Sequence, residues 1–339
     1  MTTSPAHPPF PSHSIDPFGR RIDYLRISVT DRCNERCLYC MPEGYKGWAG
    51  RPDHLTAAEI VRIAKSATGL GFRKFRVTGG EPLIRADIVP ILEGIWDLPG
   101  TESLGLSTNG TRLAGLAAAI RAAGVRSINL SLDALDPETY HRITGGDLRV
   151  VQAGLDAALS QNFEVIKLNC VLLRGANEQE YLPLIRFAAA HGLPLRFIEL
   201  MPLSRIGAWN TDSFLPVSEL MSRLSACGEL TPLECYRPGH GPARYYEFRD
   251  ASLDQAAKIG FIGALTTPRF CETCNKLRLT ADGKLRPCLG RHGEIDLLAG
   301  LRSGVDPAAV LSQAIANKPE NHEFLDDYAP GRPMTAIGG

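Results

Sequence analysis

The sequence has no net charge, no long apolar run and no internal repeat. Its 37 basic and 37 acidic residues cancel, so no overall positive field favours nucleic acid or a membrane surface, and we expect neither as a partner. No stretch of about eighteen apolar residues is present, which argues against a membrane-spanning helix. The first twenty residues hold five prolines and no apolar run of signal-peptide length. We therefore expect a cytoplasmic protein with a disordered leader over residues 1–20.

Nine cysteines are present, and in a cytoplasmic chain they indicate metal binding or thiol chemistry rather than disulfides. Six of them fall in two triplets, which are Cys33, Cys37 and Cys40, and Cys271, Cys274 and Cys288. The other three are isolated, and we expect Cys170, Cys227 and Cys235 to be buried structural thiols.

Residues 22–200 alternate between short β-branched runs and amphipathic helical runs. The six runs that we expect to be strands cover residues 24–29, 72–80, 103–110, 126–133, 164–173 and 194–200. Because about eight βα units close a full barrel, six predict an α/β fold, an incomplete (βα)6 TIM-like parallel barrel over residues 21–230. An open, doubly wound parallel sheet is the alternative.

Beyond residue 230 the pattern changes to hairpin-like pieces, two short helices and a tail rich in proline and glycine. A turn at Asp282 and Gly283 joins two of these pieces. We expect residues 231–339 to form a C-terminal domain that caps the barrel opening and carries the second cysteine triplet.

Every expected strand contains polar or charged residues, although the strands of a parallel sheet are normally apolar. An internal ion pair can explain any one of them, but six strands together favour a large polar ligand inside the barrel. Four interruptions are cationic, which favours an anionic ligand such as a phosphate. These four are Arg26, Arg76, Lys167 and Arg196.

The first triplet lies in the loop after the first strand, at the barrel end where such folds place their active sites. Thiolates grouped this closely bind zinc or an iron–sulfur cluster. A structural zinc site would need a fourth ligand, and the nearest histidine, His54, is fourteen residues beyond Cys40. A cubane held by three cysteines leaves one iron open to a small molecule.

The second triplet has the spacing CX2CX13C and again offers three thiols. By itself it is also compatible with a zinc knuckle completed by a histidine such as His292.

The spacing CX3CX2C, with Tyr39 before the third cysteine, resembles the defining motif of the radical S-adenosylmethionine enzymes. The resemblance implies that the open iron of a [4Fe-4S] cluster chelates S-adenosylmethionine and that one electron releases a 5′-deoxyadenosyl radical, which abstracts a hydrogen atom. The segment 78–82, Thr-Gly-Gly-Glu-Pro, resembles the GGEP segment that contacts the methionine moiety, and an ordinary strand-to-helix turn is its alternative.

Both triplets together, followed by a terminal Gly-Gly, resemble the GTP 3′,8-cyclase family of molybdenum cofactor biosynthesis. The motifs that carry this resemblance are LRISVTDRCNERCLYCMP, RVTGGEPL, LSTNG, NLSLDA, RFIELMP, FCETCNKLRL and IGG. The family forms 3′,8-cyclo-7,8-dihydro-GTP from GTP, by removal of the ribose 3′ hydrogen and attack of C3′ on guanine C8. The resemblance thus implies a lyase with two [4Fe-4S] clusters.

Roles follow from the resemblance position by position. Cys33, Cys37 and Cys40 would hold the cluster that binds S-adenosylmethionine, and Cys271, Cys274 and Cys288 the cluster that binds guanine. The residues expected at S-adenosylmethionine are Tyr39, Gly80, Ser131 and Met201. Those expected at GTP are Arg26, Arg76, Ser107, Lys167, Lys276, Leu277 and Arg278. The tail glycines, Gly338 and Gly339, would reach toward the site.

The resemblance also implies a one-electron reductant of flavodoxin or ferredoxin type, a downstream cyclic pyranopterin monophosphate synthase, and a homodimer as a candidate assembly. Two positions depart from the family pattern. Ser107 replaces a frequent threonine and keeps the hydroxyl, whereas Lys276 replaces a usual arginine and loses its bidentate geometry. The competing hypotheses are a radical enzyme that matures a peptide and a zinc-stabilised nucleotide-binding protein without catalysis.

Overall fold

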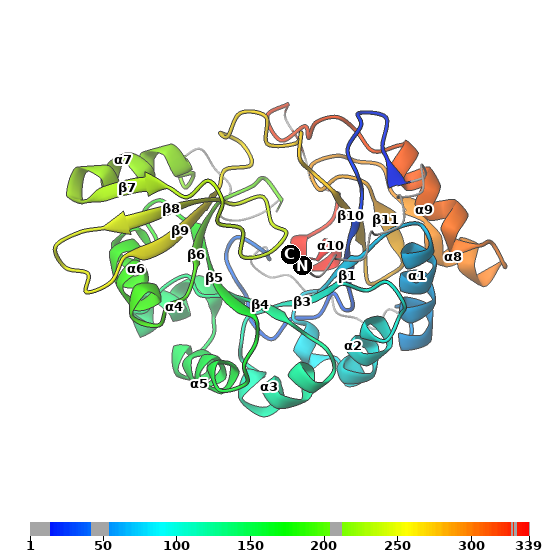
Figure 1. Ribbon diagram of the computed structural model, residues 1–339, viewed down its shortest axis with the longest axis horizontal. Helices are drawn as coiled ribbons and strands as arrows, with labels where there is room; N and C mark the ends of the chain where they lie inside the picture. The colour runs from blue at the N-terminus through cyan, green and yellow to red at the C-terminus, as the bar shows by residue number, and fades with distance from the viewer. Residues whose placement is uncertain (1–13, 42–53, 204–211, 327, 329–330, 339) are drawn as a thin grey trace, which may run out of the picture.

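The computed structural model describes residues 14–41, 54–203, 212–326, 328 and 331–338. All six expected strands are present, and a helix follows each along the chain. Figure 1 shows a strongly curved sheet with α1 to α6 on its outer face and α10 inside the curve. Within the described ranges, no helix is both long and apolar enough to span a membrane. The structure therefore confirms the expected α/β partial barrel.

The elements have the following bounds. The strands are β1 (Tyr24–Ser28), β2 (Lys74–Thr78), β3 (Ser103–Thr108), β4 (Ser127–Ser131), β5 (Val165–Leu172), β6 (Leu195–Glu199), β7 (Glu229–Pro232), β8 (Arg244–Arg249), β9 (Ala257–Ile262), β10 (Lys276–Leu279), β11 (Lys284–Arg286) and β12 (Ile295–Asp296). The helices are α1 (Ala57–Gly69), α2 (Ile88–Trp96), α3 (Leu113–Ala122), α4 (Pro137–Thr144), α5 (Leu148–Leu159), α6 (Tyr181–Ala190), α7 (Val217–Cys227), α8 (Leu297–Arg302), α9 (Pro307–Ala316) and α10 (Met334–Ile337). Two 3-10 turns are η2 (Pro82–Ile84) and η3 (Glu178–Glu180).

The C-terminal region extends the barrel sheet at both of its edges. The strand order is β12-β11-β10-β1-β2-β3-β4-β5-β6-β9-β8-β7. β10 pairs in parallel with β1, and β9 pairs in parallel with β6, so both continue the parallel sheet. The hairpins expected beyond residue 230 exist as β8–β9 and β10–β11. They therefore add strands to the barrel wall.

Helix α4 is an element that we did not expect from the sequence. Asp136 caps its first turn by accepting a hydrogen bond from the Thr139 backbone N–H at 2.7 Å. Gly145 ends it in the left-handed conformation with φ of 68°. The helix lies beside the loop of the first cysteine triplet, and its last turn accepts hydrogen bonds from that loop.

Side chains alternate between the outer core and the inside of the barrel. On β1, Leu25 and Ile27 are fully buried in the core under the helices, whereas Arg26 between them lines an internal cavity. Because successive residues of a strand point to opposite faces, one polar residue between two apolar ones is directed inward. This alternation explains the polar residues found in every strand.

The residues just before β1 belong to the fold. Ser14, Asp16 and Arg20 are buried, and Arg20 donates to the carbonyls of Pro319 and Glu320 at 2.5 and 2.7 Å. Residues 14–20 are thus packed against the C-terminal region, although the sequence analysis places them in the leader. Residues 1–13 lie outside the described part.

The isolated cysteines do not share one environment. Cys170 is buried, as expected, but Cys227 and Cys235 are exposed. Our expectation was therefore wrong for these two. Cys227 is the last residue of α7, and Cys235 lies in the turn between β7 and β8. Both positions leave a small side chain on the surface.

Candidate active site

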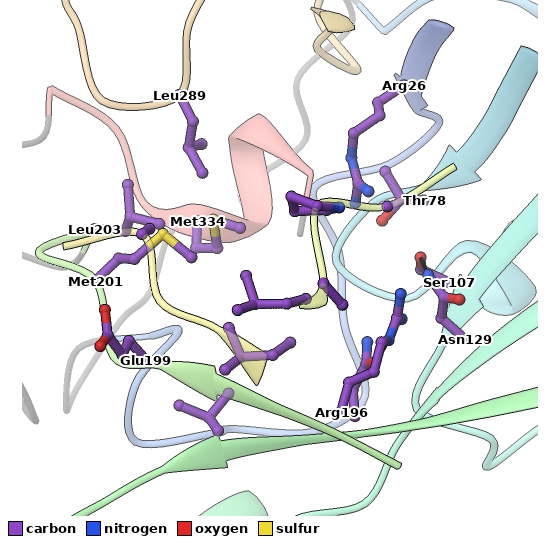
Figure 2. Close-up of a pocket in the computed structure, with 18 of the residues that line it drawn as sticks. Arg26, Thr78, Ser107, Asn129, Arg196, Glu199, Met201, Leu203, Leu289 and Met334 are labelled. Carbon is purple, nitrogen blue, oxygen red and sulfur yellow. Dashed lines mark hydrogen bonds between the residues drawn. The ribbon is translucent and has the colours of Figure 1, made fainter. Parts of the chain in front are cut away.

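One cavity of about 1020 Å³ lies inside the barrel and reaches both cysteine triplets. Figure 2 shows Ser107, Asn129 and Arg196 on one side of it, with Met201 and Met334 on the other. Most of the expected site residues line this cavity: Cys33, Cys37, Cys40, Cys271, Cys274, Cys288, Tyr39, Gly80, Ser131, Met201, Arg26, Arg76, Ser107, Lys167, Lys276 and Arg278. The cavity thus has a polar side and an apolar side.

Two of the expected residues that the structure describes, Leu277 and Gly338, are not among those that line the cavity. Leu277 is fully buried in the apolar core, because it alternates with Lys276 and Arg278 along β10. Its side chain therefore faces away from the cavity. Gly338 lies beside the wall of the cavity, and Gly339 is outside the described residues.

The loop with the first triplet is held mainly by the α4 region. The backbone N–H groups of Arg36 and Leu38 donate to the carbonyls of Thr144 and Ile143 at 2.7 and 2.9 Å. Tyr39 donates its hydroxyl to Asp133 at 2.7 Å. These contacts fix the loop in a conformation that turns its cysteines toward the cavity.

A second side-chain hydroxyl, that of Tyr140 on α4, supports the same loop. Tyr140 donates its hydroxyl to Glu35 Oε1 at 2.8 Å. Glu35 is buried between Cys33 and Cys37, and burial raises the pKa of its carboxyl to about 7. The loop is thus anchored at three points along its length.

All six triplet cysteines are free thiols. Burial raises the pKa of Cys33 to about 11 and that of Cys40 to about 12, so by themselves these thiols stay protonated at neutral pH. Iron stabilises the thiolate and releases the proton. Three convergent thiols at one cavity wall are therefore a donor set that fits an iron–sulfur cluster. Among the described residues, no three Cys, His, Asp or Glu side chains are grouped closely enough to hold a single metal ion.

The glycines of segment 78–82 allow two loops to touch. A Cβ on Gly80 would lie 2.3 Å from the carbonyl oxygen of Arg32, in the cysteine loop. The Gly80 N–H donates to the Thr30 carbonyl at 2.8 Å. Glycine here serves a close approach between two parts of the chain, and Gly80 also lines the cavity.

Glu81, the next residue, is fully buried and well satisfied. Its carboxylate accepts from Thr108 Oγ1 at 2.8 Å, from the Asn109 N–H at 2.7 Å and from the Leu83 N–H at 2.9 Å. It joins the ends of β2 and β3 beside the first triplet. Glu81 also caps the first turn of η2, so the segment serves as a strand-to-helix turn as well as a support for the first triplet.

The histidines near the second triplet are engaged elsewhere. His292 stacks on Tyr328 with ring centroids 5.0 Å apart and does not line the cavity. His322 does line it, but its Nε2 bonds the Ala264 carbonyl at 2.7 Å and its Nδ1 accepts from the Phe324 N–H at 3.3 Å. Neither histidine is therefore oriented as a fourth ligand for the second triplet.

We use the name cationic layer for a group of cavity-lining residues: Arg26, Arg76, Lys167, Arg196, Lys276 and Arg278. Several of these residues lie in register on neighbouring strands. Arg278 on β10 pairs with Arg26 on β1, and Arg26 pairs with Arg76 on β2. Further along, Lys167 on β5 pairs with Asn129 on β4. Residues in register point to the same face of a sheet, so all of these side chains reach into the cavity.

Two cations of the layer are fixed by protein acceptors. Arg76 donates to the Tyr24 hydroxyl at 2.7 Å, to the Leu106 carbonyl at 2.9 Å and to Ser127 Oγ at 3.0 Å. Arg196 donates to Asn169 Oδ1 at 2.8 and 2.5 Å. Tyr24 and Asn169 line the cavity as well. These acceptors orient the arginines before any ligand is bound.

Burial, together with repulsion between neighbouring cations, lowers the pKa of Lys167 and Arg26 in this layer. Burial, Arg76 and Arg196 lower the pKa of Lys167 to about 6. Burial and Arg278 lower the pKa of Arg26 to about 9. Among the described residues, no carboxylate forms an ion pair with Lys167 or Arg196. The cavity thus concentrates positive charge that a polyanion would neutralise.

Asn129 provides further evidence for a polar ligand. Its side chain is almost fully buried, and its Nδ2 donates to Ser107 Oγ at 3.3 Å. Its Oδ1 is buried and has no hydrogen-bond partner in the described structure. A buried, unsatisfied acceptor at a cavity wall calls for a donor from the ligand.

The C-terminal tail contacts the cationic layer directly. Arg278 Nη1 donates to the Gly338 carbonyl at 3.0 Å. Gly338 has φ of 89°, and a Cβ there would lie 2.9 Å from Cβ of Ser28. Glycine is needed at this position for both its backbone conformation and its small size.

Several residues of the site were not expected from the sequence. Tyr24 is one, because a tyrosine at the start of a strand looks like an ordinary core residue. The segment 237–243 is another: it lines the cavity, and the Pro238 carbonyl accepts from Lys167 Nζ at 2.7 Å. Its two glycines and two prolines were the only signal of an irregular segment.

Comparison with known proteins agrees with this geometry. Residues 27–188 match the Radical SAM superfamily, and residues 193–324 match the family described as Molybdenum Cofactor Synthesis C. The chain is therefore a radical S-adenosylmethionine enzyme, a class that uses a [4Fe-4S] cluster and S-adenosylmethionine. It is 41% identical over 329 residues to the GTP 3′,8-cyclase of Pelotomaculum thermopropionicum, covering 96% of this chain and 99% of that protein. The chain belongs to the GTP 3′,8-cyclase family.

Other relatives support the same family. The GTP 3′,8-cyclase of Rhodopseudomonas palustris strain CGA009 is 42% identical over 336 residues, which cover 96% of this chain and 95% of that protein. Among solved structures, Streptococcus suis SuiB bound to precursor peptide SuiA has a TM-score of 0.60 at 14% identity. The match covers 85% of this chain and 64% of SuiB. At this identity the likeness shows the fold alone.

Proposed function

We propose that the chain converts GTP to (8S)-3′,8-cyclo-7,8-dihydroguanosine 5′-triphosphate, an early step of molybdopterin cofactor biosynthesis. One observation carries the proposal: both cysteine triplets and the cationic layer face a single cavity. The curated relatives, which are named GTP 3′,8-cyclase, support the reaction.

In this proposal Cys33, Cys37 and Cys40 hold the [4Fe-4S] cluster at the α4 side of the cavity. When bound, this cluster and S-adenosylmethionine supply the one-electron chemistry that removes a hydrogen atom from the substrate. Tyr39, Gly80, Ser131 and Met201 would contact S-adenosylmethionine. Tyr39 lies in the first cysteine loop and Gly80 packs against it, and all four residues line the cavity, which supports this assignment.

The second triplet would hold a second [4Fe-4S] cluster that receives the guanine base. Cys271, Cys274 and Cys288 line the same cavity, and the engaged ring nitrogens of His322 leave the site with three thiol donors from this segment. Three donors suit a cubane with one open iron. The peptide-maturing alternative would not use a guanine site.

The cationic layer would bind the triphosphate. Arg26, Arg76, Lys167, Lys276 and Arg278 all reach the cavity, and phosphate oxygens are the natural partners of guanidinium and ammonium groups. Ser107 and Leu277 would complete the GTP site, Ser107 through its hydroxyl and Leu277 through its backbone. Gly338, which accepts from Arg278, and Gly339 would bring the tail to this end of the ligand.

Lys276 departs from the usual arginine, and its surroundings differ from those of Arg278. Its ammonium lies 5.3 Å above the Tyr24 ring centroid and donates to Asn275 Oδ1 at 2.8 Å. We infer that Lys276 contributes a single point charge to triphosphate binding, while Arg278 supplies the bidentate contact.

The reaction also needs an electron donor and a consumer of its product. We propose a flavodoxin or ferredoxin as the reductant, a cyclic pyranopterin monophosphate synthase as the next enzyme, and a homodimer as the assembly. The reductant and the next enzyme follow from the proposed reaction, and the homodimer follows from the family resemblance alone.

The test is the reaction itself. Anaerobically reconstituted protein with reductant, S-adenosylmethionine and GTP labelled with deuterium at C3′ should transfer the label to 5′-deoxyadenosine. Variants with Cys271→Ala or Cys33→Ala serve as controls that each lack one triplet. Absence of 5′-deoxyadenosine would overturn the proposal, and unlabelled 5′-deoxyadenosine would point to another substrate.

A further inference from the structure

Lys318 lies just beyond α9 and is buried beside the second cysteine triplet, with 3% of its surface exposed. Its Nζ donates to the carbonyls of Lys276 and Pro287 at 2.8 and 2.6 Å. Lys276 lies two residues after Cys274, and Pro287 immediately precedes Cys288. One ammonium group therefore joins the two stretches of chain that carry these cysteines.

Arg20 connects the remaining cysteine to the same segment. Its Nη1 donates to the Cys271 carbonyl at 3.0 Å, and its guanidinium also bonds the carbonyls of Pro319 and Glu320. Asp16 pairs with Arg20 at 2.6 Å. All three cysteine-bearing stretches are thus tied, through two buried cations, to residues 318–320.

The two cations differ in their charge balance. Arg20 has the carboxylate of Asp16, whereas no carboxylate forms an ion pair with Lys318 in the part of the chain that the structure describes. A buried ammonium needs negative charge nearby. Lys318 Nζ instead bonds the two stretches of chain that carry Cys274 and Cys288. A cluster held by these cysteines, with its thiolate ligands, would place negative charge beside Lys318.

We propose that Lys318 is a positioning residue for the second iron–sulfur cluster, an inference that rests on the proposed function of that triplet. Its two hydrogen bonds hold Cys274 and Cys288 in place, and its charge makes the cluster easier to reduce. A nearby cation stabilises the more negative, reduced state of a cluster. Lys318 does not line the cavity, so it acts through the cysteines rather than on GTP.

The test isolates the second cluster in the full chain. Cys33, Cys37 and Cys40 are all changed to alanine in a parent variant, so that any cluster formed on anaerobic reconstitution belongs to the second triplet. In this parent, Lys318→Gln removes the charge, Lys318→Arg keeps it, and Lys65→Gln removes an exposed charge on α1 as a matched control. Each protein is assayed for iron and sulfide content, for iron release to a chelator, and for midpoint potential by electron paramagnetic resonance.

We expect Lys318→Gln to release iron several-fold faster and to be reduced at a more negative potential than the parent. Lys318→Arg and Lys65→Gln should stay near the parent. Complete loss of the cluster in Lys318→Gln, with retention in Lys318→Arg, is the extreme form of the same result.

Two outcomes would overturn this inference and leave the proposed function of the second triplet unaffected. In one, Lys318→Gln matches the parent in both iron release and potential. In the other, Lys318→Arg changes as much as Lys318→Gln, which would mean that the shape of lysine matters and its charge does not. A parent that binds no iron and sulfide would instead overturn the proposed function of the second triplet, and this inference with it.

Discussion

We expect Lys167 to make GTP binding depend on pH in a defined direction. Its ammonium is 2% exposed, and burial, Arg76 and Arg196 lower its pKa to about 6. In the free protein at pH 8 it is therefore mostly neutral. A triphosphate favours the charged form, so binding should take up a proton at this residue, and affinity should fall as the pH rises above 6.

The size of the change in GTP affinity follows from the lowered pKa of Lys167. With a pKa of about 6, roughly half of the free molecules carry the proton at pH 6 and roughly one in a hundred at pH 8. When binding requires the charged form, the affinity for GTP falls about 50-fold between these pH values, which is about 2.3 kcal/mol. The terminal phosphate of GTP also loses a proton in this range, but that contribution is common to every variant.

Isothermal titration calorimetry of GTP binding at pH 6, 7 and 8 measures this effect. At pH 8, titrations in two buffers of different ionisation enthalpy should show uptake of nearly one proton by the native chain. Lys167→Gln should lack this uptake, and Lys258→Gln, at an exposed position on β9, should retain it. Equal proton uptake by the native chain and Lys167→Gln would refute the reasoning.

The same pKa gives a second readout in unfolding experiments without ligand. The folded pKa of Lys167 lies below its ordinary value of 10.5, so from about pH 6 upward the unfolded chain holds a proton that the folded chain has lost. Stability then rises with pH in that range. Lys167→Gln should lose this part of the pH dependence, which thermal unfolding at several pH values detects.

Two further predictions concern single contacts. Gly80→Ala places a Cβ against the carbonyl oxygen of Arg32, so it should displace the first cysteine loop and lose most of the iron of that cluster. Gly115→Ala, whose Cβ would meet nothing within 4 Å, is the control, and equal iron content in both would contradict the prediction. Tyr24→Phe removes an acceptor of Arg76, which costs about 1.5 to 3 kcal/mol for a charged donor. It should raise KM for GTP roughly 10- to 100-fold and leave kcat nearly unchanged, and steady-state kinetics would contradict this if kcat fell instead.

Much of the barrel could be predicted from the sequence because each of its strands and helices is specified by residues that are close together in the chain. Each βα unit shows its own hydrophobic period, and the polar residues that interrupt the strands indicate an inward-facing ligand site. Arg26 could be assigned to the cavity side because Leu25 and Ile27 flank it. The cysteine spacings are equally local and led to both triplets.

Other features depend on contacts between distant parts of the chain. No local pattern shows that β10 pairs in parallel with β1, or that β9 pairs with β6. Lys318 follows a helix, where the sequence predicts a surface lysine, and only the structure shows that it is buried and bonds the carbonyls of Lys276 and Pro287. Helix α4 is short, so its hydrophobic period was too brief to recognise.

The pairing of β10 with β1 has a consequence for biosynthesis. Asp23 just before β1 and Asn275 just before β10 are hydrogen-bonded across 252 residues of sequence. During translation the edge of β1 that later pairs with β10 therefore keeps its backbone donors and acceptors unpaired until most of the chain has left the ribosome. This makes nascent chains vulnerable to aggregation, and chaperone demand should fall sharply once residue 279 has emerged. The second triplet, which extends to Cys288, is completed at the same late stage.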